Sequence, residues 1–184
     1  MHLKDAPAGY GWLSIALHWL NAIAVVMLWF IGNKMTGNAI AESEAAELLH
    51  VHTSVAVTVY ALIWLRIIWR FYSGHPAGLP DQGRIRFMIA RTVHYILLMT
   101  IAVMLISGPL QVWFAGEVIG FYMLGAIPGP FTANENLAIW FATAHRWAGN
   151  VLFVVALVHM TAAAKQIVFA RGETARRMTA PTGR

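Results

Sequence analysis

Four histidines lie within apolar stretches of this chain, at His18, His52, His145 and His159. The last two are 14 residues apart, a spacing that in an α-helix covers about four turns and returns the side chain to roughly the same face. At about 1.5 Å of rise per residue, they are separated by roughly 21 Å along the helix. Neutral imidazole is a strong axial ligand for haem iron, and two imidazoles fill both axial positions. The histidines therefore predict two bis-histidine b-type haem sites at different depths of a helical membrane bundle.

The chain contains no cysteine, which excludes disulfides, thiolate-bound metals, iron–sulfur clusters and covalently attached c-type haem. Any redox group must therefore be held by histidine or methionine. Two histidine ligands leave no open position on the iron, so oxygen binding is disfavoured and electrons would be exchanged at the haem edge.

The elements that must position these histidines are transmembrane helices. The sequence is 59% hydrophobic and only 11% charged, and its mean hydropathy of +0.61 is too high for an ordinary soluble domain. Four stretches are each about long enough to cross a bilayer as a helix: Trp12 to Ile31, Leu48 to Leu65, Thr92 to Ala115 and Leu137 to Ala164. We expect an all-α membrane protein, a four-transmembrane-helix bundle, in which residues 1–184 form a single domain.

The distribution of charge predicts the orientation. Basic residues gather in the second connection and the C-terminal tail: Arg66, Arg70, Arg84, Arg86, Arg91, Lys165, Arg171, Arg176, Arg177 and Arg184. The first connection has one lysine and three glutamates, and the third has two glutamates and no basic residue. The positive-inside rule then places both termini in the cytoplasm. Since the net charge of +5 is not collected on a polar domain, nucleic acid is not an expected partner.

Depth in the membrane predicts which histidines act together. The first helix would start inside and the fourth outside, so His18 and His159 reach similar depths near the cytoplasmic face. His52 and His145 lie near the outer ends of their helices. We therefore predict one haem between His18 and His159 and another between His52 and His145. His50 is separated from His52 by about 200° around the helix, and the small residues near His52 favour His52 as the ligand.

Several other residues are candidates for supporting roles. His94 has no spare histidine at its depth and is interpreted as a residue behind the ligands or in contact with a quinone, although a purely structural role is equally open. His2 and His75 are expected to be exposed. The basic residues near span ends could pair with haem propionates or only reach towards lipid headgroups: Arg66, Arg70, Arg91 and Arg146.

Two non-redox interpretations compete with haem ligation. A single histidine in a membrane helix is often a hydrogen-bonded interior residue. A histidine-dependent metal or ion transporter would use the same residue type, but it would more often recruit carboxylates, methionines or cysteines beside it. The predicted spans contain no carboxylate, which makes the transporter the more remote alternative.

Local sequence elements resemble those of the bacterial cytochrome b561 family, from about Trp12 to Phe169. They are His18-Trp19-Leu20-Asn21-Ala22, His52-Thr53-Ser54, Leu65-Arg66-Ile67-Ile68-Trp69-Arg70, His94 followed by Ser107-Gly108, and the histidine pair on the fourth helix. The sequence departs from the family pattern in two places. Lys165-Gln166 stands where many members have further histidines, and Ala56 stands where a glycine is usual.

The resemblance implies a di-haem electron carrier, with His18 and His159 holding a cytoplasmic haem and His52 and His145 a periplasmic one. The sequence is similar to quinone-linked members of this family, including superoxide oxidases that pass an electron to ubiquinone. It is also similar to cytochrome b subunits that relay electrons for a partner dehydrogenase, hydrogenase or reductase. The expected partners are thus the lipid bilayer, the quinone pool, and a soluble electron donor or partner subunit.

Overall fold

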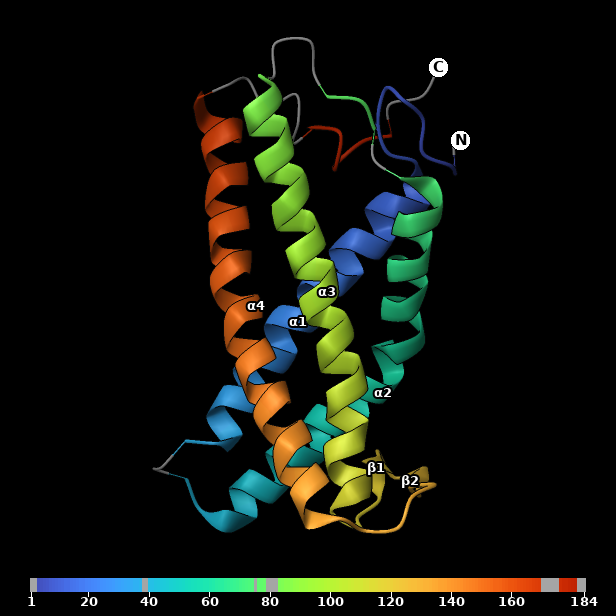
Figure 1. Ribbon diagram of the computed structural model, residues 1–184, viewed down its shortest axis with the longest axis vertical. Helices are drawn as coiled ribbons and strands as arrows, with labels where there is room; N and C mark the ends of the chain where they lie inside the picture. Colours follow the sequence, from blue (N-terminus) through green and yellow to red (C-terminus); the bar gives the residue numbers. More distant parts are fainter. Residues whose placement is uncertain (1–2, 38–39, 75, 79–82, 170–175, 182–184) are drawn as a thin grey trace. The chain divides into compact units, whose positions relative to one another are not determined.

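The computed structural model describes residues 3–37, 40–74, 76–78, 83–169 and 176–181. Its elements are α1 (Trp12–Met35), α2 (Glu42–Ser73), α3 (Arg84–Phe114), β1 (Ile119–Phe121), β2 (Gly125–Ile127) and α4 (Glu135–Phe169), as labelled in Figure 1. All four helices are long and apolar enough to cross a membrane. This confirms the all-α class with four transmembrane helices.

The helices are longer than the apolar stretches that predicted them. α2, for example, begins at Glu42 and ends at Ser73, beyond the expected span on both sides. Hydropathy marks only the part that fits the hydrocarbon core, whereas polar end residues continue the helix into the headgroup region. Glu42 and Glu44 lie in the first turn of α2, where a negative charge favours the partial positive charge of a helix N-terminus.

The helices contribute to two compact units, and each unit contains part of every helix. The first unit comprises residues 1–21, 62–99 and 154–184, and the second comprises residues 22–61 and 100–153. Because neither unit is one continuous stretch of chain, the chain does not divide into sequential domains at this level. The single-domain assignment stays a prediction.

Large apolar side chains point away from the interior of the units. Phe30, Ile68 and Val154 are 59%, 62% and 59% exposed, as expected for side chains that contact lipid. Buried positions include the small polar residues Ser14, Ser54 and Ser107, together with Asn21 and Arg70. Small and hydrogen-bonding residues are the usual contacts between helices in a membrane, where lipid already solvates the apolar ones.

In the first unit, the N-terminal segment is bound to the helices through a buried carboxylate. Asp5 accepts hydrogen bonds from the backbone N–H of Gly11 at 2.8 Å and from the hydroxyl of Ser14 at 2.7 Å. The indole N–H of Trp69 in turn donates to the Ser14 oxygen at 2.8 Å. The start of α1 is thereby joined to the end of α2.

Residues near both ends of the chain also meet in the first unit. The backbone of Ala77 donates to Pro7 and accepts from the Arg177 guanidinium. The Trp19 indole donates to the carbonyl of Met178 at 2.8 Å. An even number of membrane crossings requires both ends to be on one side, but the cytoplasmic location of that side stays a prediction.

In the second unit, α3 contains a proline that is accommodated by a side chain from α2. Pro109 lacks the N–H that would bond the carbonyl of Leu105 one turn earlier. The Tyr60 hydroxyl donates to that carbonyl at 3.3 Å. A backbone carbonyl without a partner is costly in a membrane, so this hydrogen bond allows α3 to continue through Pro109.

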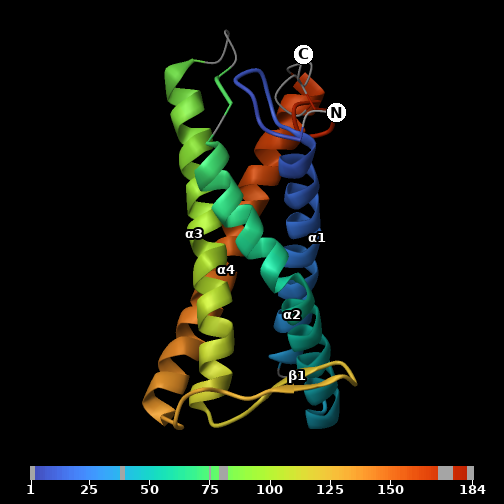
Figure 2. The same cartoon turned by 90° about the vertical axis from the view of Figure 1, so that its right-hand side faces the viewer.

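The third connection contains a short antiparallel hairpin, which the sequence did not predict. β1 pairs with β2, with Ile119 opposite Ile127, and Figure 2 shows β1 beside the N-terminal part of α2. Ser54 accepts from the backbone N–H of Tyr122 at 2.8 Å, and Thr53 donates to the carbonyl of Gly120 at 3.0 Å. The hairpin is therefore fixed to the same turn of α2 that carries His52.

Candidate functional site

The structure brings the first predicted histidine pair together in the first unit. His18 comes from α1 and His159 from α4, and their ring centres are 6.3 Å apart with an interplanar angle of 70°. The second predicted pair lies in the second unit. His52 comes from α2 and His145 from α4, and their ring centres are 6.5 Å apart with an angle of 78°. α4 thus contributes one histidine to each pair.

Both separations fit a metal ion held between two imidazoles. A metal–imidazole nitrogen distance is about 2.0–2.1 Å, and a ring centre lies roughly 1.1–1.2 Å behind its nitrogen, so two imidazoles on one metal have ring centres about 6.2–6.6 Å apart. The rings can rotate about their bonds to the metal, so steep interplanar angles are compatible with axial ligation. The residues present therefore fit bis-histidine haem, although their role as ligands stays a prediction.

Two glycines make room for the rings of the second pair. A Cβ on Gly32 of α1 would lie 3.4 Å from Cε1 of His52, and a Cβ on Gly108 of α3 would lie 3.2 Å from Cε1 of His145. Each ring therefore lies directly against the backbone of a neighbouring helix. Such close approach is the common reason for a glycine inside a membrane helix.

Replacing either glycine with alanine adds the same methyl group, but we expect the two substitutions to differ in how much haem the protein retains. Gly108→Ala is expected to displace the His145 ring and to cost about 1–3 kcal/mol, as overpacking typically does. Gly32→Ala adds its methyl group at an ordinary contact distance and is the matched control. We expect Gly108→Ala to lose haem during purification while Gly32→Ala retains it. Equal retention by the two variants would show that Gly108 does not constrain His145.

The first pair has a cationic neighbour. Nη2 of Arg66 is 2.9 Å from Nδ1 of His18, so a positively charged guanidinium lies against this ring. His94 also joins this cluster, with its ring centre 5.1 Å from that of His159. The structure therefore places Arg66 and His94 beside the first pair, which is where supporting residues would have to lie.

The other predicted arginines lie elsewhere. Arg70 is buried, with its guanidinium 4.0 Å from the Asp5 carboxylate, over the ring of Tyr10 and bonded to the carbonyl of Gly74. This arrangement holds Arg70 at the end of α2, and its contact with a propionate stays a prediction.

Arg91 and Arg146 are both exposed. Arg91 lies over the ring of Tyr95 at 5.6 Å, and Arg146 follows His145 on α4. Their contacts with propionates stay predictions.

His50 and His52 have different surroundings, as their positions on the helix predicted. A Cβ on Gly120 of β1 would lie 3.0 Å from Nδ1 of His50, so His50 packs against the hairpin while His52 faces His145. His2, His75, Arg171 and Arg184 lie outside the described residues. The contact of Gly32 with His52 was not predicted from the sequence, although a glycine in an apolar helix is a signal of close packing.

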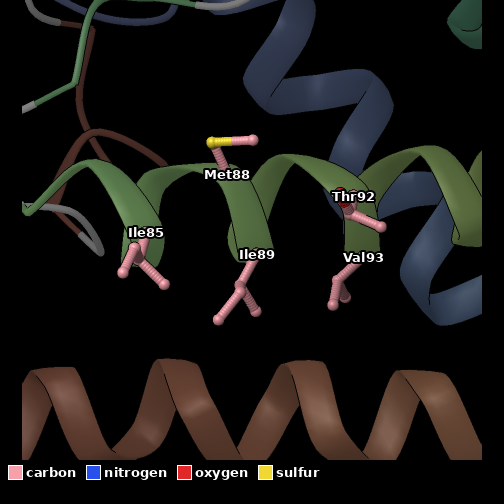
Figure 3. Close-up of a pocket in the computed structure, with 5 residues that line it drawn as sticks. All are labelled: Ile85, Met88, Ile89, Thr92 and Val93. Carbon is pink, nitrogen blue, oxygen red and sulfur yellow. The ribbon is translucent and has the colours of Figure 1, made fainter.

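An apolar groove borders α3 in the first unit. It is lined by Ile85, Met88, Ile89, Thr92 and Val93. Figure 3 shows Ile85, Ile89 and Val93 pointing towards the ribbon of α4. The lining contains no titratable group and ends one residue before His94, so the groove suits an apolar chain rather than a reacting group.

Four membrane-spanning helices with two facing histidine pairs and no cysteine define a helical membrane cytochrome that would hold haem without covalent attachment. The chain belongs to the prokaryotic cytochrome b561 family, whose model matches residues 9–181. It is similar to "Cytochrome b561 homolog 2" of Escherichia coli (strain K12), with 25% identity over 178 residues, covering 97% of this chain and 95% of that relative. Family membership implies a multi-pass bacterial membrane protein that binds haem b and transfers electrons across the membrane.

Proposed function

We propose that this chain transfers electrons across the bacterial inner membrane through two b haems, one held by His18 and His159 and the other by His52 and His145. The observation that carries this proposal is the pair of ring separations, 6.3 Å and 6.5 Å. Both agree with the spacing of two axial imidazoles, and each pair joins α4 to a different helix.

The chain's own residues would control how each haem is held and how it reacts. A b haem at each pair would supply a one-electron carrier. Gly32 and Gly108 let the rings of the second pair lie against the helix backbone. Arg66 presents a positive charge to the first pair. The surrounding apolar helices exclude water and so strengthen these electrostatic effects.

We further propose that the first pair exchanges electrons with the quinone pool, ubiquinone being one candidate. The groove that ends beside His94 would accommodate the apolar tail of a quinone (Figure 3). His94 lies 5.1 Å from the ring centre of His159, where a histidine could exchange a proton with a quinone oxygen. Arg146, exposed beside His145, would attract an anionic donor such as superoxide to the other pair.

The transporter alternative receives no support from the site. Within the parts of the chain that the structure describes, no group of three or more histidine, cysteine or acidic side chains could hold a metal ion.

A role as the cytochrome b subunit of a larger oxidoreductase would use the same two haems. Copurification of a partner subunit would distinguish that role from a stand-alone enzyme.

Haem stoichiometry tests the proposal directly. The protein is purified in detergent from cells with an adequate haem supply, and haem b per chain is measured by pyridine haemochrome. Two haems per chain are expected, with a dithionite-reduced spectrum of a b-type cytochrome. One haem would contradict the two-site proposal, and none in a folded preparation would end the redox interpretation.

A further inference from the structure

Ser107 of α3 is 2% exposed and lies between two groups that together determine where its proton is. Its Oγ is 2.6 Å from the carbonyl oxygen of Val103 and 3.1 Å from Nδ1 of His145. Two oxygens this close share a hydrogen, and the carbonyl has none to give. The Ser107 hydroxyl therefore donates to Val103.

Because a serine hydroxyl has one proton, Ser107 can only accept a hydrogen bond from His145. The His145 imidazole must then carry its proton on Nδ1 and its lone pair on Nε2. The ring also contacts the backbone of Met104, whose carbonyl can likewise only accept. Both neighbours therefore favour the tautomer that leaves Nε2 available to a metal.

His52, the other member of the pair, lacks an equivalent of Ser107. Its ring contacts the backbone of Leu28, but its buried Nδ1 makes no hydrogen bond of normal geometry within the described residues. Ile31 precedes Gly32 in α1, whereas Ser107 precedes Gly108 in α3. The contact of Gly32 with His52 and that of Gly108 with His145 are otherwise similar. The hydrogen-bonding side chain of Ser107 is thus the polar feature that only the second contact has.

We propose that Ser107 is a positioning residue, which holds the His145 imidazole with Nε2 free for iron and keeps the reduction potential of that haem low. The inference rests on the proposed function, since it requires a haem between His52 and His145. A hydrogen bond from Nδ1–H to an acceptor orients an axial histidine and makes it a more basic ligand. A more basic ligand stabilises ferric over ferrous iron, which lowers the potential.

The test is a potentiometric titration of the purified protein, followed by visible absorption, for wild type, Ser107→Ala and Thr58→Ala. Thr58 is the matched control, because its hydroxyl also bonds a carbonyl one turn earlier in the second unit, that of Ser54 at 2.8 Å, and its second polar neighbour is the Tyr122 hydroxyl. Ser107→Ala is expected to raise one of the two midpoints and leave the other. Thr58→Ala is expected to leave both.

Two further variants separate hydrogen bonding from packing. Ser107→Thr keeps the hydroxyl and should restore the wild-type midpoint, whereas Ser107→Cys keeps the size but accepts weakly and should give an intermediate one. Two haems with unchanged midpoints and an unchanged ferric EPR spectrum in Ser107→Ala would overturn the proposal. If that variant does not fold, a wild-type midpoint in Ser107→Cys would overturn it instead. A wild-type protein without haem at the second pair would overturn the proposed function, and this inference with it.

Discussion

Replacing His145 with alanine is expected to remove one haem per chain, and replacing His52 is expected to remove the same one. The two rings lie 6.5 Å apart on different helices, so either substitution leaves the iron with a single protein ligand. His18→Ala and His159→Ala are expected to remove the other haem, because those rings form the first pair, with centres 6.3 Å apart. The four variants should therefore fall into two spectral classes, measured by pyridine haemochrome and by the midpoint of the haem that remains.

His50→Ala is the matched control for these four variants. His50 lies two residues before His52 but packs against Gly120 of the hairpin, so its loss should leave both haems in place. The pairing would be refuted if His18→Ala and His52→Ala removed the same haem. Loss of a haem from His50→Ala with retention in His52→Ala would exchange the roles of these two histidines.

The helices and the histidine pairs could be predicted because each depends on a property that is local in the sequence. Apolar length defines a membrane span, and the alternating direction of successive spans determines which histidines reach similar depth. Thus His18 could be assigned to His159 without any knowledge of packing. The structure places these two rings together as that argument predicts.

Contacts between distant side chains could not be predicted in this way. The proximity of Arg70 to Asp5, from the segment before α1, was not predicted. The hairpin was missed because each strand has only three residues, with glycines and no alternating pattern, and Tyr122 adopts a positive φ of 45°. Neither feature has a sequence signal, because both depend on which segments pack against each other.

Replacing Arg66 with methionine is expected to lower the potential of the haem held by His18 and His159. Arg66 lies 2.9 Å from Nδ1 of His18, and ferric iron carries one more positive charge than ferrous iron, so a nearby cation disfavours oxidation. In a partly buried site the effect should be roughly 1–3 kcal/mol, or about 50–130 mV for a one-electron couple. Potentiometric titration should show this shift in one haem only.

The effects of the charge and of the shape of Arg66 on the haem potential can be measured separately. The potentials also bear on the direction of electron flow. Arg66→Lys keeps the charge and should keep most of the potential, while Arg86→Met removes an exposed arginine of the same unit and should change little. An equal shift in Arg66→Lys and Arg66→Met would assign the effect to shape instead. Arg66 raising the potential of the first pair and Ser107 lowering that of the second both favour electron flow from the haem at His52 and His145 to the haem at His18 and His159.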